Sequence, residues 1–394
     1  MSDLRITMLA HNLRVAGGAV VGKNLLKAIA ALAPQHTYQI SIPDDPDYRE
    51  IVAAFPNCEP VVFRASGGVI RRTLYERREI AQTVRGFRPD VVFGMGGVGL
   101  DNPPCPQALY VQDAHYFYPS KYFAMESARR RMVKAYHKWT LGRQLRKTAL
   151  LLCQTPVAVE RLRTTFSFVP RIEICPNAVT TFAEKTGDTT AAADRLDALE
   201  SRFKLFYLTK YYPHKNLEGI VDMFDRFRSE LDDVAAVITV APDQHSKAPG
   251  FIDSIARRGL SDRIVNVGPL KQQELGAYYT YCDALLMPTF LESFSGTYLE
   301  AMHFGTPILT SDLDFARGIC GDAAVYFDPW DPSAMKDAVL KLKADAALQK
   351  ELIHKGNARL ASMYAGWDRI AADLMAKLVS LASVASAPHS NRGP

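Results

Sequence analysis

Two acids frame a loop that could hold a polar ligand. Glu292 lies before a helix that is expected to begin near Ser295–Thr297, and Glu300 lies about one turn inside it. Backbone N–H groups at the positive end of a helix dipole bind phosphate or sugar hydroxyl oxygens, and the loop presents such groups at Ser293, Phe294, Ser295 and Gly296. The spacing predicts two acids that contact different parts of one ligand. The alternative is an exposed loop acid and a solvent-facing helix residue.

Two lysines lie in an earlier loop of the same kind. Lys210 and Lys215 fall between an expected strand at 204–208 and a helix with an apolar face from Leu217 to Phe227. Two loop lysines by themselves are more often solvated. Their place upstream of the two acids favours a role at the ligand, because ligands of open α/β sheets bind outside the carboxyl ends of the strands.

The elements that must position these loops are two series of short apolar runs separated by helical patterns. The first series is expected at 5–10, 38–42, 60–63, 90–93, 108–111, 149–153 and 171–175, and the second at 204–208, 234–240, 263–267, 284–287, 308–310 and 324–327. This alternation is typical of parallel sheets covered by helices on both faces. The predicted fold class is α/β, with two Rossmann-like domains.

Glycines follow the first expected strand. Gly17 and Gly18 precede a helix, an arrangement that lets the backbone approach an anionic group at the helix N-terminus. A tight turn is the alternative. The chain lacks a full Gly-x-Gly-x-x-Gly with a following ribose-binding acid, which argues against a nicotinamide dinucleotide site. A second glycine-rich loop, Gly94–Gly99, also follows a strand and could border the same cleft.

Composition and charge exclude several classes of protein. A chain of 394 residues with 48% hydrophobic residues can bury two ordinary cores. The formal net charge of +5 is modest, so no nucleic-acid partner is expected. Six cysteines without a Cys-x-x-Cys pair argue against zinc and against a disulfide framework. No signal peptide or membrane span is expected, which predicts a cytoplasmic protein.

The string from Glu292 to Pro307 resembles a known family. Glu-x7-Glu followed by Ala-Met-x-x-Gly-x-Pro is similar to the donor-site signature of retaining nucleotide-sugar glycosyltransferases with the GT-B fold, in particular glycosyltransferase family 4, or glycosyl transferases group 1. The family's usual Glu-Gly-Phe-Gly-Leu-Pro is replaced here by Glu-Ser-Phe-Ser-Gly-Thr, which keeps the backbone contacts but obscures the donor sugar. Pro176–Val179 also resembles the Pro-Asn-Gly-Val that closes the family's first domain.

The resemblance implies a role for each of these residues. The predicted catalytic residues are Glu292, beside the donor sugar and its phosphate, and Lys210 and Lys215, on the donor diphosphate. Lys210 stands where the family usually has Arg, which keeps the charge but loses bidentate geometry. Glu300 would accept hydrogen bonds from the ribose hydroxyls. Further donor contacts are expected at Gly17, Gly18, Phe294, Ser295, Gly296 and Thr297.

The position of the family's usual His is occupied by Gln112 in this chain. Gln112 follows the expected strand at 108–111, and Asp113 and His115 come directly after it. Three interpretations stay open. His115 substitutes for the missing His, Gln112 makes the contact to the sugar or acceptor, or Asp113 and His115 form a structural pair.

The implied reaction moves a hexosyl group from a GDP- or UDP-sugar to a hydroxyl of a glycan or lipid-diphosphate acceptor, with retention of configuration, in bacterial polysaccharide or glycolipid synthesis. The leaving phosphate takes the acceptor proton, so no enzyme nucleophile is needed. No cofactor and no metal are expected, because two lysines and a helix dipole neutralise the diphosphate. The acidic strings at 44–47 and 311–314 are therefore not interpreted as Asp-x-Asp metal motifs.

The domain boundaries follow from the elements and the resemblance. A first, acceptor-binding domain is expected at 1–180, completed by an amphipathic helix at 367–382, and a second, donor-binding domain at 203–366, with a cleft between the two. The polar segment at 181–202 is predicted to be a linker. Residues 383–394 are predicted to be a disordered tail.

A basic segment at 126–147 has two interpretations. It carries eight Arg or Lys residues against one acid, with Met132 and Trp139 among them. A solvated helix face is one interpretation. The other is a surface for anionic lipid, where each Lys or Arg contributes about 1 kcal/mol, which would place the protein peripherally on the inner membrane face.

Other functions stay open as alternatives. A sugar-nucleotide epimerase would share the architecture but need no acceptor. A dinucleotide dehydrogenase would share the alternation of strands and helices and would bind nicotinamide. A scaffold or lipid-surface binding module would keep the fold without turnover.

Overall fold

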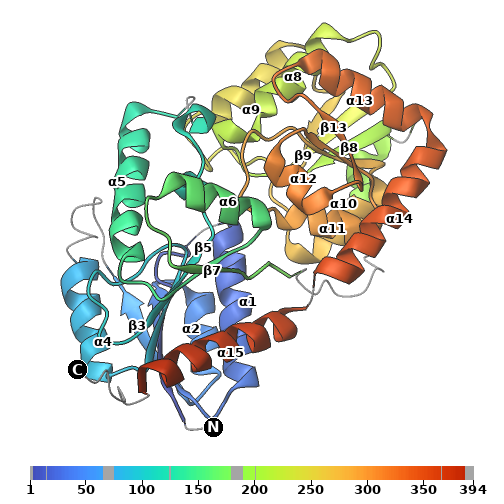
Figure 1. Cartoon of the computed structure of the whole chain (residues 1–394). Coiled ribbons are helices and arrows are strands. Elements are labelled where there is room, and N and C mark those ends of the chain that lie inside the picture. The colour runs from blue at the N-terminus through green and yellow to red at the C-terminus, as the bar shows by residue number, and fades with distance from the viewer. Residues whose placement is uncertain are drawn as a thin grey trace. The chain divides into compact units, whose positions relative to one another are not determined.

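The computed structural model describes residues 3–14, 16–64, 75–123, 126–178, 190–199, 201–364 and 366–386. They fall into two compact units (Figure 1). The first unit takes its described residues from Met1–Ser120, Ser127–Ala178 and Gly366–Pro394, and the second from Lys121–Glu126 and Val179–Ala365. The chain therefore returns to the first unit for its last helix.

The first unit is built on a sheet of seven strands in the order β3-β2-β1-β4-β5-β6-β7, and every paired neighbour is parallel. The strands are β1 (Arg5–Leu9), β2 (Thr37–Pro43), β3 (Cys58–Phe63), β4 (Val91–Met95), β5 (Gln107–Val111), β6 (Leu150–Cys153) and β7 (Arg171–Ile174). The strand order reverses between β1 and β4. Ligands of open α/β sheets bind at such a switch point, outside the carboxyl ends of the strands.

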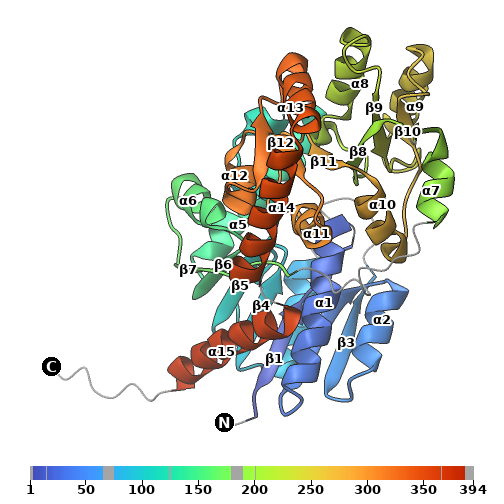
Figure 2. The same cartoon turned by 90° about the vertical axis from the view of Figure 1, so that its right-hand side faces the viewer.

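Helices pack on this sheet along its whole length. They are α1 (Ala16–Leu32), α2 (Pro46–Ala53), α4 (Ala81–Phe87), α5 (Ala128–Leu145), α6 (Pro156–Thr165) and α15 (Trp367–Ser386), with shorter turns at η1 (Glu76–Ile80), η2 (Ala114–Tyr116) and η3 (Ser120–Phe123). Helix α15 packs against α1, although the two lie at opposite ends of the sequence (Figure 2). Its Leu374 and Leu378 are fully buried, so the last helix forms part of the first unit's core.

The second unit repeats this plan with six strands in the order β10-β9-β8-β11-β12-β13, all of them parallel. The strands are β8 (Phe203–Tyr207), β9 (Val234–Ile238), β10 (Ile264–Asn266), β11 (Ala284–Met287), β12 (Ile308–Ser311) and β13 (Ala324–Phe327). The helices are α7 (Thr190–Leu196), α8 (Leu217–Arg226), α9 (Ala248–Arg257), α10 (Leu275–Tyr281), α11 (Gly296–Phe304), α12 (Asp314–Cys320), α13 (Pro332–Ala344) and α14 (Ala346–Met363), with η4 (Asp197–Leu199), η5 (Pro213–Lys215) and η6 (Gln272–Glu274) between them. Strands β8 and β11 are direct neighbours.

Short apolar runs form the strands of both units. All four residues of β11 are buried, and the strand ends before Pro288, which has no N–H to extend the ladder. Helix α8 likewise buries one face, which carries Leu217, Ile220, Val221, Met223 and Phe224. Each predicted strand has an observed counterpart whose ends agree within two residues. The prediction of an α/β protein with two parallel sheets is confirmed.

The segment predicted as a linker, 181–202, is helical at residues 190–199. Residues 190–199 form α7 and η4 and belong to the second unit. They fold because apolar side chains within the polar run are buried there, namely Ala192, Leu196 and Leu199. Residues 179–189 and 200 lie outside the described residues, as does that part of the linker prediction.

The predicted tail at 383–394 also begins inside a helix. Helix α15 continues to Ser386, past the buried side chain of Ala382. The prediction that the chain is disordered from residue 383 is therefore wrong for 383–386, because burial of Ala382 carries the helix onward. Residues 387–394 lie outside the described residues.

Candidate functional site

Hydrogen bonds join the two predicted ligand loops of the second unit. One loop follows β8 and the other follows β11, at the carboxyl ends of neighbouring strands. The carbonyl of His214 in the first loop accepts from Phe290 N–H at 2.8 Å and from Thr289 Oγ1 at 3.0 Å in the second. Sequence segments far apart in the chain thus form one surface.

Asn216 strengthens this connection and was not singled out from the sequence. Its Nδ2 donates to Pro288 O at 3.1 Å and to Pro329 O at 2.8 Å, and the side chain is buried. Its φ of 53° lies in the left-handed region, which Asn tolerates better than most residues. The one signal for it in the sequence was the position of this Asn, between Lys215 and helix α8. Its long-range partners could not be read from the sequence.

Lys215 and Glu292 form an ion pair across the two loops, although they lie 77 positions apart in the sequence. Only 17% of the Lys215 side chain and 11% of the Glu292 side chain are exposed. Tyr207 Oη donates to the Lys215 carbonyl at 2.9 Å, which fixes the backbone from which the ammonium extends. The structure therefore brings these two predicted residues into direct contact.

Lys210 lies in the same loop but outside this ion pair. Its side chain is exposed and forms no ion pair with any residue that the structure describes. The backbone beneath it is held by Thr209, whose N–H donates to Thr239 Oγ1 at 2.9 Å and whose Oγ1 donates to the Lys210 carbonyl at 3.0 Å. An exposed cation therefore extends from a hydrogen-bonded position in the loop.

Glu300 lies in the first half of α11 and is held by Tyr279, which the sequence analysis did not identify. Tyr279 Oη donates to Glu300 Oε2 at 2.7 Å. Burial raises the pKa of Glu300 to about 6, and the hydrogen bond from Tyr279 opposes that rise. A Cβ placed on Gly296 would lie 3.7 Å from Glu300 Oε1, so the carboxylate lies beside the first turn of the helix.

The N-terminus of α11 has no side-chain cap. Ser295 occupies the N-cap position with extended backbone, but its hydroxyl accepts no N–H of the first turn. The N–H groups of Gly296 and Thr297 belong to the helix end that lacks intrahelical acceptors. Phe294 is buried and packs edge-on against Tyr364 at 5.8 Å between ring centroids. Because the Phe294 ring is packed there, its predicted contact with the donor would be made by backbone atoms.

Gly17 and Gly18 lie in the first turn of α1, in the first unit. Neither has a positive φ, so the backbone itself does not demand glycine there. A Cβ added to Gly17 would meet nothing within 4 Å. The open space agrees with the expectation that a ligand approaches the backbone here, and the donor contact stays a prediction.

The polar residues after β5 form a structural cluster. The Asp113 carboxylate accepts the N–H of His115 at 2.9 Å and pairs with the His115 ring, whose other nitrogen contacts Lys134 on α5. Burial lowers the pKa of Lys134 to about 8, and the charge of Asp113 opposes this. The amide nitrogen and oxygen of Gln112 are enclosed by protein. The structure shows the Asp113–His115 pairing, and the roles of Gln112 and His115 toward a ligand stay predictions.

The acidic strings considered as metal motifs make other contacts. Asp44 pairs with Arg49 at 2.6 Å, Asp45 caps α2, and Asp312 pairs with Arg317 at 2.8 Å. Within the described ranges, no group of three or more His, Cys, Asp or Glu side chains could hold a metal ion. The six cysteines are free thiols. No described helix is long and apolar enough to cross a membrane.

Residues 188–359 match the family model described as "Glycosyl transferases group 1". The second unit carries a group 1 glycosyltransferase domain. This match includes Lys210, Lys215, Glu292 and Glu300, so the family predicted from the Glu-x7-Glu string is confirmed. The retaining stereochemistry and the assignment to glycosyltransferase family 4 stay predictions.

Curated relatives of the group 1 glycosyltransferase domain cover only part of the chain. D-inositol 3-phosphate glycosyltransferase of Salinispora tropica is 25% identical over 206 residues, which is 49% of this chain and 42% of the relative. The serotype-specific mannosyltransferase WbdA of Escherichia coli is 25% identical over 185 residues, 45% of this chain and 22% of the relative. The chain thus spans less than half the length of these relatives.

Solved structures are similar over nearly the whole chain and show the fold. Sucrose-phosphate synthase from Thermosynechococcus elongatus has a TM-score of 0.76 at 15% identity, covering 97% of this chain and 100% of that one. Anabaena HepE in complex with UDP and glucose has a TM-score of 0.73 at 13% identity, covering 96% and 100%. WaaG, a glycosyltransferase involved in lipopolysaccharide biosynthesis, has a TM-score of 0.71 at 14% identity, covering 97% of this chain and 100% of that one. The chain has the GT-B fold.

Replacing Glu300 by Gln should stabilise the protein at neutral pH. A carboxyl whose folded pKa is raised from 4.5 to about 6 contributes stability below pH 4.5 that is lost as the pH rises through 6. Glu300→Gln should therefore raise the free energy of unfolding at pH 7 by up to about 2 kcal/mol, with no gain below pH 4.5. Urea unfolding at a series of pH values measures this.

The control for this measurement is Asp243→Asn, which neutralises an exposed acid in the same unit. Its unfolding free energy should follow that of the wild type at every pH. A Glu300→Gln variant that is equally stable or less stable than the wild type at pH 7 would contradict the burial of an ionised carboxylate.

Proposed function

We propose that this protein is a glycosyltransferase that moves a hexosyl group from a UDP- or GDP-sugar to a hydroxyl of a glycan or lipid-linked acceptor, with retention of configuration and without a metal ion. The observation that carries the proposal is the Lys215–Glu292 ion pair, held by hydrogen-bonded loops within a group 1 glycosyltransferase domain. An uncapped helix N-terminus lies in the same loop.

Stabilisation of the leaving diphosphate is the main chemical demand of this reaction. Negative charge develops on the diphosphate as its bond to the sugar breaks, and fixed cations and N–H donors stabilise it. Lys215 offers a positioned ammonium, Lys210 an exposed one, and the first turn of α11 offers N–H groups. When a diphosphate binds, it shares Lys215 with Glu292, which leaves that carboxylate to accept the sugar hydroxyls.

Glu300 would hold the nucleoside end of the donor. A carboxylate accepts hydrogen bonds from two ribose hydroxyls, and Tyr279 fixes its orientation through the hydrogen bond of 2.7 Å. With a pKa of about 6, Glu300 is mostly ionised at neutral pH and accepts these bonds. Donor affinity should therefore fall as the pH drops below 6.

Retention follows in the proposed reaction from attack on the same face that the diphosphate leaves. The bond from the anomeric carbon to the phosphate oxygen breaks, and the acceptor oxygen forms its bond to that carbon. The acceptor proton passes to the departing phosphate oxygen. Glu292 orients the sugar, and no enzyme side chain forms a covalent bond.

The names of similar proteins support this substrate class. HepE was solved with UDP and glucose, and WbdA is a mannosyltransferase. A nucleotide sugar donor and a role in bacterial polysaccharide or glycolipid synthesis agree with both names. These names do not separate UDP- from GDP-sugars, so both belong to the proposal.

Loss of either lysine should slow transfer. A charge-assisted hydrogen bond contributes about 1.5–3 kcal/mol, so Lys210→Ala and Lys215→Ala should each lower kcat/KM roughly ten- to a hundredfold. Nucleoside diphosphate release in the presence of donor and a glycan acceptor measures the rate. Lys247→Ala, at an exposed lysine of the same unit, should leave it unchanged.

Glu292→Ala separates the proposal from its alternatives. Abolished transfer by a variant that still unfolds cooperatively would exclude a scaffold without turnover. Nucleotide-sugar epimerisation by the wild type without any acceptor would instead show an epimerase. Full transfer activity in both lysine variants would contradict the proposed site.

A membrane surface is the second partner that we propose, through the outer face of α5. Met132 is 71% exposed and Trp139 55% exposed, two turns apart on one face of the helix. The Arg143 guanidinium lies 5.0 Å from the centroid of the Trp139 ring, and Arg129 and Arg131 flank the same face. Exposed Trp beside arginines suits the boundary between anionic headgroups and acyl chains.

The α5 face should bind anionic vesicles and lose that binding when its apolar residues are removed. The wild type should sediment with phosphatidylglycerol vesicles but less with phosphatidylcholine vesicles, and high salt should weaken binding. Met132→Ala with Trp139→Ala should reduce sedimentation. Phe168→Ala, at another exposed aromatic of the first unit, is the matched control. Equal sedimentation with both lipids would contradict this proposal.

A further inference from the structure

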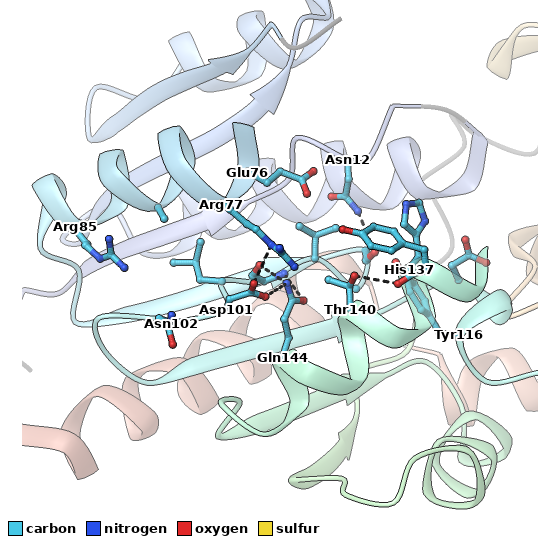
Figure 3. A pocket seen from close by; sticks show the side chains of 18 residues that line it. Asn12, Glu76, Arg77, Arg85, Asp101, Asn102, Tyr116, His137, Thr140 and Gln144 are labelled. Atoms are coloured by element: carbon cyan, nitrogen blue, oxygen red, sulfur yellow. Dashed lines mark hydrogen bonds and ion pairs between the residues drawn. The ribbon is translucent and has the colours of Figure 1, made fainter. Parts of the chain in front are cut away.

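Loops at the carboxyl ends of the strands are held by polar side chains from neighbouring elements in both units. In the first unit, Gln144 of α5 accepts from Gly99 N–H at 3.2 Å and donates to Gly99 O at 2.7 Å. Figure 3 shows Gln144 reaching toward Asp101 at the end of the same glycine-rich loop, which lines a cavity of about 370 Å³. This cavity lies in the unit that is predicted to bind the acceptor. In the second unit, a threonine hydroxyl has the corresponding role beside Glu292.

The hydroxyl of Thr289 bonds to both loops of the candidate site. It donates to Leu291 O at 3.1 Å within the loop after β11 and to His214 O at 3.0 Å in the loop after β8, and it accepts from Leu291 N–H at 3.4 Å. Because a threonine hydroxyl carries one proton, the two donated bonds share it. The same proton therefore links the peptide before Glu292 to the loop of Lys215.

The backbone of Thr289 is anchored from a third strand. Thr289 and Ser311, the last residue of β12, are both fully buried. Ser311 Oγ donates to Thr289 O at 2.7 Å and lies 3.3 Å from Met287 O at the end of β11. Since β11 and β12 are paired neighbours, these bonds attach the start of the loop to the sheet. The side chain of Thr289 then holds Leu291, two residues further along.

The position of Glu292 depends on this hydroxyl most when a ligand is bound. In the unliganded protein, the ion pair with Lys215 also holds the carboxylate. In the proposed function the donor diphosphate shares Lys215, so the attraction between Lys215 and Glu292 weakens. The carboxylate is then positioned by its backbone, and the hydrogen bonds between Leu291 and Thr289 hold that backbone.

We propose that Thr289 is a positioning residue that keeps Glu292 against the donor sugar once the diphosphate has engaged Lys215. The proposal rests on the glycosyltransferase function proposed above, and it assigns Thr289 no contact with substrate. A purely structural role would change the affinities for a nucleoside diphosphate and for a nucleotide sugar by the same factor. A positioning role changes only the part of the affinity that the sugar supplies.

Thr289→Val removes the hydroxyl and keeps the shape of the side chain. Isothermal titration calorimetry of the full chain with UDP, UDP-glucose, GDP and GDP-mannose gives the dissociation constants. Loss of one hydrogen bond weakens an interaction roughly two- to tenfold. The variant should therefore raise the Kd of the nucleotide sugar by that factor more than the Kd of the matching nucleoside diphosphate. Equal changes in the two constants overturn the proposal.

Two further variants separate the hydroxyl from general effects of burial. Thr289→Ser restores the hydroxyl and should bind both ligands like the wild type. Thr310→Val is the matched control, because Thr310 is also fully buried and its Oγ1 donates to Met287 O at 3.1 Å and lies 2.7 Å from Tyr298 Oη. This control should leave the ratio of the two constants unchanged. A ratio that shifts as far in Thr310→Val, or that Thr289→Ser does not restore, overturns the proposal.

A second removal of the hydroxyl covers the case in which Thr289→Val does not fold. Thr289→Ala places no γ-methyl group against the two carbonyls and carries the same prediction, and urea unfolding shows which variant is folded. The wild type separates this proposal from the proposed function. A wild type that binds none of the four nucleotides overturns the glycosyltransferase and the role of Thr289 with it. A wild type that binds a nucleotide sugar, with the same ratio in the folded variant, overturns only the role of Thr289.

Discussion

The connection between the loops after β8 and β11 is the constraint on which the candidate site depends. These loops follow neighbouring parallel strands, so the topology places them side by side. The strand order alone does not fix how the two loops are oriented toward each other. Three hydrogen bonds, to His214 O and from Asn216 Nδ2, join the two loops, and the Lys215–Glu292 ion pair spans the same connection. Each loop is thus positioned by the other.

This arrangement prepares charges for an anionic ligand before the ligand arrives. A lysine buried without a partner would destabilise the fold, because no attraction to an opposite charge would offset the desolvation of its ammonium group. Glu292 balances Lys215 in the unliganded protein, and the diphosphate would supply the second anion. The uncapped end of α11 adds N–H donors that water otherwise satisfies. The same groups therefore hold the empty loops together and would receive the donor.

Local sequence patterns predicted most of the fold. Apolar runs such as Ala284–Met287 are strands because both of their faces are covered, and the proline after that run ends it. The linker was predicted incorrectly where α7 and η4 form. Their buried residues, such as Leu196, are isolated within a polar stretch, and their packing partners lie far along the chain. No local pattern could reveal that burial.

In the candidate site, too, some residues could be predicted from local patterns and others depend on distant contacts. The acids and lysines were found because their loops follow expected strands. Asn216 and Tyr279 were missed because their roles come from contacts 72 and 21 residues away, with Pro288 and Glu300. The loop Gly94–Gly99 was recognised as a possible border of a site. At its end the N–H groups of Gly99 and Leu100 donate to the side-chain oxygens of Gln144 and Gln107, and these tertiary contacts could not be read from the sequence.

A crystal structure of the protein soaked with a UDP- or GDP-sugar is the most direct measurement of the central claim. The account predicts diphosphate oxygens within hydrogen-bond distance of Lys215 Nζ and of the first-turn N–H groups of α11, with the sugar against Glu292. A nucleotide sugar bound elsewhere, with the Lys215–Glu292 pair undisturbed and the α11 N-terminus facing only water, would contradict it.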